Sequence, residues 1–196
     1  IDRLNIAKAT ACSILDNLDD DVNVMVIGFY GEVRTVFLQS PASEREAIKE
    51  VIKNLEAYQG TFMGSALNYT YEMVTSLPYE KNEVILISDG LPYGEQAASA
   101  RAIVKKMAQA NIMLSTIHTI STEGTDLMKE LASLGRGYYY YIKDVDDADA
   151  LVLNGVMNSL TETILESNES SVEVLLKKES LVEGIENLPN IKGLYN

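Results

Sequence analysis

The run from Glu83 to Gly90 constrains the fold of this chain more than any other part of the sequence. It reads Glu-Val-Ile-Leu-Ile-Ser-Asp-Gly, a short apolar segment typical of a strand that is buried on both faces of a sheet. Ligands of open α/β sheets bind outside the carboxyl ends of the strands, so Asp89 is expected where binding or chemistry takes place. An aspartate there is suited to be a ligand of a divalent metal, a general base or a nucleophile.

The rest of the chain alternates strands with helices around this run. Two apolar segments at 22–30 and 33–38 are separated by a turn at Gly31 and should pair antiparallel. Further strands are predicted at 83–88, 112–119 and 138–142, and helical spacing predicts helices at 3–18, 43–55, 63–77, 95–110, 125–134 and 147–165. We therefore predict an α/β fold: a Rossmann-like, doubly wound, mostly parallel sheet with one antiparallel edge strand and helices on both faces.

Two helices are specified in more detail. Ser43 is the predicted N-cap of its helix, because Glu46 follows three residues later as in a capping box. That helix is expected to bury Ala47, Ile48, Val51, Ile52 and Leu55. The helix at 95–110 is expected to bury Ala100, Ile103, Val104, Met107 and Ala108.

The last thirty residues differ from this pattern. Val172, Val174 and Leu176 alternate with more polar positions, which predicts a half-buried strand. We divide the chain into a domain at 1–166 and a C-terminal tail at 167–196, which reads as the start of a following unit. The chain opens on Ile1 within a predicted helix, so we expect a longer protein with residues upstream.

Charge excludes some classes of partner. The net charge of −13, from 29 acidic and 16 basic residues, argues against nucleic acid and anionic membrane surfaces, because both attract basic patches. No apolar run approaches the roughly 20 residues that span a bilayer, so the fragment itself is expected to be soluble. The single cysteine, Cys12, excludes an internal disulfide and is expected to be a small buried helix residue.

The order of these segments resembles the von Willebrand factor type A (VWA) domain. The resemblance lies in the helix at 4–18, the strand pair at 24–29 and 33–38, Gly60-Thr61 before Ala66-Leu67, the run Val84–Gly90, and the segment Leu131–Tyr140. It covers about residues 1–165. The tail, with Leu181–Ile185 and Asn187-Leu188-Pro189, is similar to the segment that follows this domain in bacterial membrane proteins carrying a glutamine-amidotransferase-like module.

The resemblance implies a metal-ion-dependent adhesion site (MIDAS) at one end of the sheet. Thr61 matches the family's threonine ligand and Asp89 matches its aspartate ligand, for Mg²⁺ or Mn²⁺ in the intact domain. The family's Asp-x-Ser-x-Ser motif is absent from this chain and is expected upstream of Ile1, so the site in this chain is incomplete.

The family's first, central strand is likewise missing, between the strands at 22–30 and 83–88. Such a gap leaves backbone groups unpaired, so we hypothesise that another strand fills it. Residues 171–177 are the candidate, from the same molecule or exchanged with a neighbour in a homodimer. The competing account is a strand supplied by residues outside this sequence.

By this resemblance the chain is a non-catalytic protein-binding or adhesion module of a membrane-anchored or cell-surface bacterial protein. A partner's acidic residue would complete the metal site. One alternative is a metal-free scaffolding domain, and another is an α/β hydrolase-type enzyme that uses Asp89. Enzyme signatures are missing from the sequence: there is no dinucleotide-binding or phosphate-binding glycine loop and no nucleophile elbow.

Two further features have structural interpretations. His118, the only histidine, is expected to be a satisfied core or sheet-face residue, because no serine or cysteine motif accompanies it. The run Tyr138–Tyr141 is expected to place two rings on each side of a strand as packing.

Overall fold

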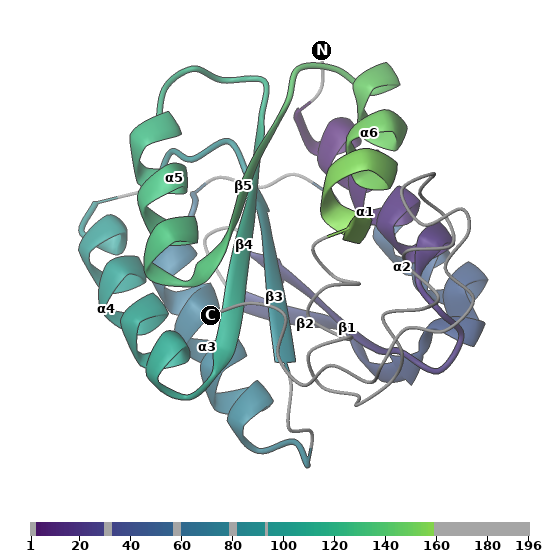
Figure 1. The fold of residues 1–196 in the computed structure, drawn as a ribbon, viewed down its shortest axis with the longest axis horizontal. Coiled ribbons are helices and arrows are strands. Elements are labelled where there is room, and N and C mark those ends of the chain that lie inside the picture. The colour runs from purple at the N-terminus through teal and green to yellow at the C-terminus, as the bar shows by residue number, and fades with distance from the viewer. Residues whose placement is uncertain (1–2, 30–32, 57–59, 79–81, 93, 159–196) are drawn as a thin grey trace, which may run out of the picture. The chain divides into compact units, whose positions relative to one another are not determined.

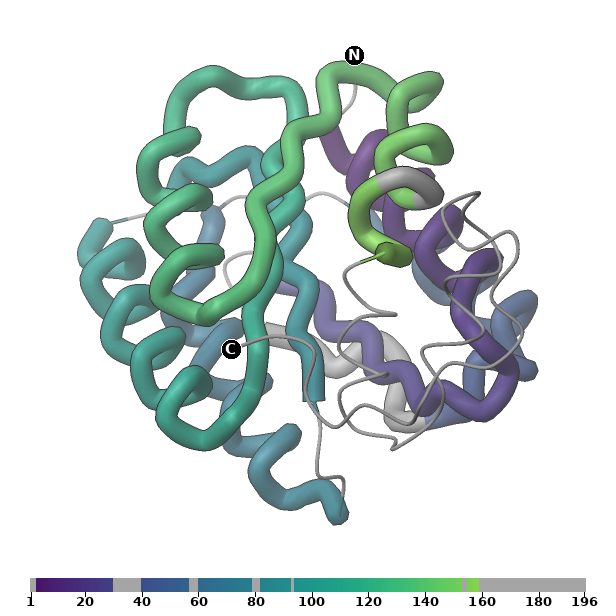
Figure 2. The backbone as a smooth tube through the Cα atoms, in the orientation of Figure 1, coloured from purple at the N-terminus to yellow at the C-terminus, as the bar shows by residue number. Residues whose placement is uncertain are grey.

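The computed structural model describes residues 3–29, 33–56, 60–78, 82–92 and 94–158 (Figures 1 and 2). Helices and strands alternate through them as the sequence predicts. The helices are α1 (Arg3–Asn17), α2 (Arg45–Lys53), α3 (Met63–Thr75), α4 (Gln96–Gln109), α5 (Thr125–Leu134) and α6 (Asp146–Leu151), and the strands are β1 (Asn23–Phe29), β2 (Val33–Pro41), β3 (Asn82–Ser88), β4 (Ile112–Thr119) and β5 (Arg136–Ile142). A π-helical turn at Val152–Val156 follows α6, within the helix predicted at 147–165.

The described strands form two sheets. β3, β4 and β5 lie side by side in that order and are parallel, whereas β1 and β2 form a separate antiparallel pair. The α/β architecture, the parallel order and the antiparallel strand are thus confirmed. β3 pairs only with β4 among the described strands, and no described strand joins β1 to β3. The segment 171–177, proposed to fill that position, lies outside the described residues.

Helices cover both faces of the parallel sheet, as predicted. In Figure 1, α3, α4 and α5 lie on one side of the three strands, and α1 and α6 lie on the other. The core on the first side combines residues of α3, α4 and α5 with inward-facing residues of β3 and β4. The helix at 95–110 behaves as its apolar spacing predicts, because all five of its expected core residues are buried: Ala100, Ile103, Val104, Met107 and Ala108.

The start of α2 differs from the prediction. Residues 42–44 form a 3₁₀ turn and Glu44, without a side-chain cap bond, precedes the first helical residue, so the assignment of Ser43 as N-cap was wrong. The backbone explains the difference. The Ala42 N–H donates to the Val22 carbonyl at 2.8 Å and the Ser43 N–H to the Asp20 carbonyl at 3.1 Å. These bonds hold the turn against the loop before β1. Ile48 and Ile52 are buried as predicted, but Ala47 is exposed.

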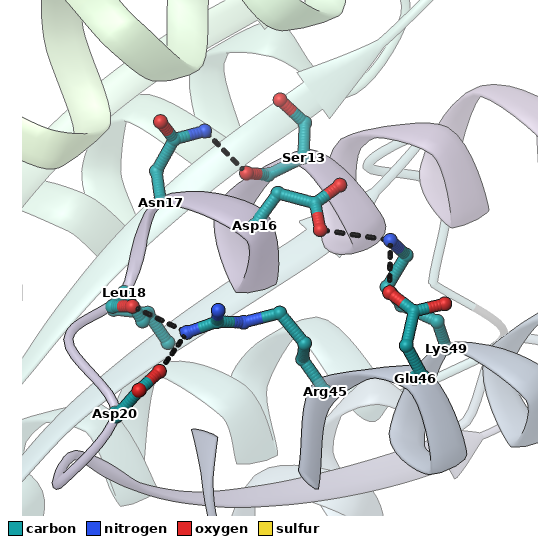
Figure 3. Close-up of polar contacts among 8 residues, drawn as sticks. All are labelled: Ser13, Asp16, Asn17, Leu18, Asp20, Arg45, Glu46 and Lys49. Atoms are coloured by element: carbon teal, nitrogen blue, oxygen red, sulfur yellow. Dashed lines mark hydrogen bonds and ion pairs between the residues drawn. The ribbon is translucent and has the colours of Figure 1, made fainter. Parts of the chain in front are cut away.

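Polar contacts join α1 and the loop after it to α2 (Figure 3). Lys49 Nζ lies 2.8 Å from Asp16 Oδ1 and 3.0 Å from Glu46 Oε1, and Arg45 Nη2 lies 2.6 Å from Asp20 Oδ1. Leu15, Ile48 and Ile52 form a buried apolar cluster, and the partly buried Cys12 packs against it. Burial raises the pKa of the Cys12 thiol, which lowers the fraction of the reactive thiolate.

Candidate functional site

Asp89 lies directly after β3, at the carboxyl edge of the parallel sheet. Its side chain is 22% exposed, and both of its carboxylate oxygens accept hydrogen bonds. Arg3, in the first turn of α1, donates from Nη1 to Oδ2 at 2.7 Å, and the Leu91 N–H donates to Oδ1 at 3.3 Å. The second bond closes a local turn of the kind that aspartate favours. The aspartate is therefore held between its own loop and a helix 86 residues away in sequence.

Two glycines shape the loops around this aspartate. Gly90 and Gly124 have φ angles of +76° and +77°, which residues with a Cβ atom adopt rarely. The two backbones also touch: a Cβ atom built on Gly124 would overlap the carbonyl group of Gly90. The loop after β3 and the loop after β4 are consequently in backbone contact, and side chains at these two positions would separate them.

His118, near the carboxyl end of β4, holds the same loop from within the protein. Its side chain is 0% exposed. Nε2 lies 2.9 Å from the backbone carbonyl oxygen of Asp89, and Nδ1 lies 3.3 Å from the hydroxyl of Tyr139 and 3.4 Å from that of Thr125. The expectation of a buried, satisfied histidine is confirmed. The sequence did not show that its hydrogen bond reaches the candidate site residue.

The tyrosines of β5 alternate as predicted, but Tyr138 and Tyr141 are exposed, so the expectation that all four rings serve as packing was wrong for these two. The rings of Tyr139 and Tyr141 lie 6.3 Å and 5.7 Å from the His118 ring, measured between centroids. Tyr138 and Tyr140 stack on each other at 6.4 Å. Because side chains alternate along a strand, these two pairs lie on opposite faces of the sheet.

Thr61 lies in the loop before α3 and is partly buried. The residue that precedes the first helical position is Phe62, so Thr61 does not cap this helix. The described residues show no hydrogen bond between Thr61 and Asp89. The structure thus places Thr61 at the start of α3 and Asp89 at the end of β3, and their joint role as cation ligands stays a prediction.

The described residues supply only part of a cation site. A carboxylate and a hydroxyl are oxygen ligands of the kind that Mg²⁺ and Mn²⁺ prefer. However, no group of three histidine, cysteine, aspartate or glutamate side chains in the described residues could hold a metal ion. In addition, the Arg3 guanidinium already neutralises Asp89. By themselves these residues do not fit a complete metal centre.

The family assignment follows from this architecture together with the sequence. The family model of the von Willebrand factor type A domain matches residues 2–154, and the chain belongs to this family. No curated protein matches the chain.

Solved structures share the fold. BatB, a conserved hypothetical protein from Bacteroides thetaiotaomicron, superposes with a TM-score of 0.64 at 22% identity, covering 81% of this chain and 88% of that chain. An aerotolerance-related membrane protein from Bacteroides fragilis superposes with a TM-score of 0.64 at 19% identity, covering 79% of this chain and 88% of that chain. Manganese-loaded TRAP protein from Plasmodium vivax superposes with a TM-score of 0.60 at 19% identity, covering 74% of this chain and 63% of that chain. In the described parts of this chain, no helix is long and apolar enough for a membrane crossing.

Sequence reasoning missed two residues at this edge, Arg3 and His118. Arg3 carries no sequence signal, because its contact with Asp89 depends on where α1 begins relative to β3. His118 did offer one. It lies near the carboxyl end of its predicted strand, as Ser88 does, and aligning the ends of parallel strands brings them together. The structure pairs Ser88 with His118 in register.

Proposed function

We propose that this chain is a non-catalytic protein-binding module of the VWA type that binds its partner at the Asp89 edge. The observation that carries this proposal is the state of Asp89. It follows a parallel strand, where ligands of such sheets bind, it keeps 22% of its side chain exposed, and it is hydrogen-bonded on both oxygens. A carboxylate held in this way is preorganised to bind, because little side-chain freedom remains to be lost.

Binding in the intact protein is proposed to depend on Mg²⁺ or Mn²⁺. Asp89 and Thr61 would supply two of the oxygen ligands, and further donors beyond the described residues would complete the set. An acidic side chain of the protein partner would then occupy the remaining position. The manganese-loaded state of the Plasmodium vivax neighbour and the oxygen chemistry of these two residues support this proposal.

Calorimetric titration with Mn²⁺ tests the cation proposal. Any heat of binding that the chain gives should be lost in Asp89→Asn and unchanged in Asp21→Asn, which alters an exposed aspartate in the loop before β1. Asparagine keeps the size and the local turn of aspartate and removes the charge. Equal heat from all three proteins would refute a site at Asp89, and no heat from any of them would refute cation binding by this chain.

One observation favours a second function, a metal-free scaffolding module. The Arg3 guanidinium lies 2.7 Å from Asp89 and supplies the positive charge that a metal would otherwise provide. In that case titration with Mn²⁺ would give no heat, and removal of Arg3 would weaken the binding of the partner. The membrane-anchored or cell-surface setting is proposed for either function, supported by the name of the Bacteroides fragilis neighbour.

We also propose that the chain forms a strand-exchanged homodimer through residues 171–177. Support comes from the edge of β3, which pairs only with β4 among the described strands. Val174→Pro should abolish the dimer, because proline removes a donor from a pairing strand. Light scattering with size-exclusion chromatography measures the mass, with Val182→Pro as a control outside the predicted strand. A monomeric unmodified chain would refute the exchange.

A further inference from the structure

The proposed binding role of Asp89 leaves His118 without a function. It is 0% exposed, so it cannot contact a partner or a solvent-borne ligand. Its ring nevertheless contacts three segments around the site: the loop after β3, the start of α5 and strand β5. A polar side chain is buried at a net cost unless its hydrogen bonds are made, and here both ring nitrogens have partners.

The partners determine which nitrogen carries the proton in the neutral ring. A backbone carbonyl oxygen can only accept, so the Nε2 atom that lies 2.9 Å from the Asp89 oxygen must be the donor. Nδ1 is then an acceptor. The Thr125 hydroxyl already donates to the Thr122 carbonyl at 2.8 Å, which leaves the Tyr139 hydroxyl to donate to Nδ1. Burial raises the pKa of the Tyr139 phenol, which keeps that donor protonated.

The backbone at Asp89 needs such a partner. Gly90, the next residue, has φ +76° and loses more conformational freedom on folding than a residue with a side chain. A peptide next to a permissive glycine turns easily, and turning it would redirect the Asp89 carboxylate. The bond from Nε2 to the Asp89 carbonyl opposes that rotation from the buried side.

We propose that His118 is a positioning residue that fixes the direction of the Asp89 carboxylate through the Asp89 backbone carbonyl. The proposal rests on the proposed role of Asp89 in binding. His118 acts from β4 on the loop after β3, so the site is assembled from two neighbouring strands. Arg3 then holds the side chain of Asp89 from the surface, and His118 holds the backbone of Asp89 from the interior.

Matched variants separate positioning from packing. His118→Gln retains an N–H donor at a similar distance from the backbone, whereas His118→Leu retains the bulk and removes the donor. Hydrogen exchange is measured at the amides of Gly90 and Leu91, and at Leu114 and Gly135 near the other end of the sheet. ¹⁵N NMR of the unmodified chain reports which ring nitrogen of His118 carries the proton. Mn²⁺ titration of the same proteins, with Asp89→Asn alongside, reports the binding site.

We expect the Nε2–H tautomer, and exchange at Leu91 about fivefold to tenfold faster in His118→Leu relative to Leu114 and Gly135, with recovery in His118→Gln. Uniform acceleration at all four amides would show a merely structural histidine and overturn the proposal. An Nδ1–H tautomer would also overturn it, and this measurement needs no variant that folds. If the unmodified chain binds no Mn²⁺, cation binding by this chain is refuted, while the exchange rates and the tautomer still decide the role of His118.

Discussion

β3 and β4 are neighbouring parallel strands of similar apolar composition, yet they are buried to different extents. In β4 every residue except Met113 is buried. In β3 only Leu86 and Ser88 are buried, and the others are partly exposed. β1 has no buried residue although it reads Val-Met-Val-Ile-Gly-Phe after its first position. Apolar composition predicts a strand, but it does not state how completely that strand is covered.

The difference follows from the neighbours of each strand. β4 lies between β3 and β5, and helices cover both of its faces. β3 has β4 on one side and no other described partner. A neighbouring strand covers a strand with side chains on both faces and pairs with its backbone. A strand with one described neighbour therefore has less of its apolar surface and less of its backbone covered. β4 is therefore the centre of the three described parallel strands, whereas β3, the most informative sequence run, has a described neighbour on one side only.

The largest expected effect uses a matched pair at one level of the sheet. Ile117 of β4 and Ile87 of β3 are register partners, and Ile117 is 0% exposed. We expect Ile117→Ala to lower the free energy of unfolding by about 3–4 kcal/mol and Ile87→Ala by about 1–2 kcal/mol, because the second site is already partly open to solvent. Urea denaturation followed by circular dichroism measures both. Equal losses in the free energy of unfolding would show that β3 is covered to the same extent as β4.

A smaller, pH-dependent effect is expected at the amino end of β3. Burial raises the pKa of the Glu83 carboxyl from 4.5 to about 7, although the Ser115 hydroxyl donates to it at 2.9 Å. Its Oε2 atom is buried and has no hydrogen-bond partner among the described residues. Since the folded state retains the proton up to a higher pH, stability is fully present below pH 4.5 and decreases as the pH rises from 4.5 through 7, by about 3 kcal/mol in total.

Glu83→Gln should remove most of that dependence, because the amide cannot ionise and its oxygen can still accept from Ser115. Unfolding at pH 5 and pH 8 measures the difference between the two proteins. Glu50→Gln, at an exposed position on α2, is the control and should keep the pH dependence of the unmodified chain. A Glu83→Gln variant that loses stability between pH 5 and pH 8 as the unmodified chain does would show that Glu83 is charged in the folded protein.

The smallest expected effect is at the carboxyl end of β3. Arg3→Gln removes a pair whose arginine is 53% exposed, so the free energy of unfolding should change by less than about 0.5 kcal/mol. We expect the affinity for Mn²⁺ to rise a few-fold, because the guanidinium no longer competes for Asp89. Arg101→Gln, which breaks another exposed pair, with Glu130, is the matched control. Weaker Mn²⁺ binding in Arg3→Gln would show that Arg3 supports the site.

Much of the fold was predictable because its signals are local. The five buried residues of α4 recur at helical spacing, and the apolar runs of β3 and β4 have the length of strands. The position of Asp89 at the sheet edge followed from the end of its run and from the general placement of ligands in such sheets. The prediction of the N-cap of α2 was wrong because backbone hydrogen bonds from Ala42 and Ser43 to the loop before β1 take the place of the local side-chain bond.

Local patterns in the sequence were enough to predict the class of fold, the order of its elements and the sheet edge at which Asp89 lies. Three contacts became known only from the folded chain: Arg3 pairs with the Asp89 carboxylate, His118 holds the Asp89 carbonyl, and Gly124 contacts Gly90. The tertiary structure also decided that β3 is less buried than β4. Periodicity depends on the few residues of one turn or one strand. Contacts between residues 86 or 29 positions apart depend on the packing of whole elements, which no local pattern contains.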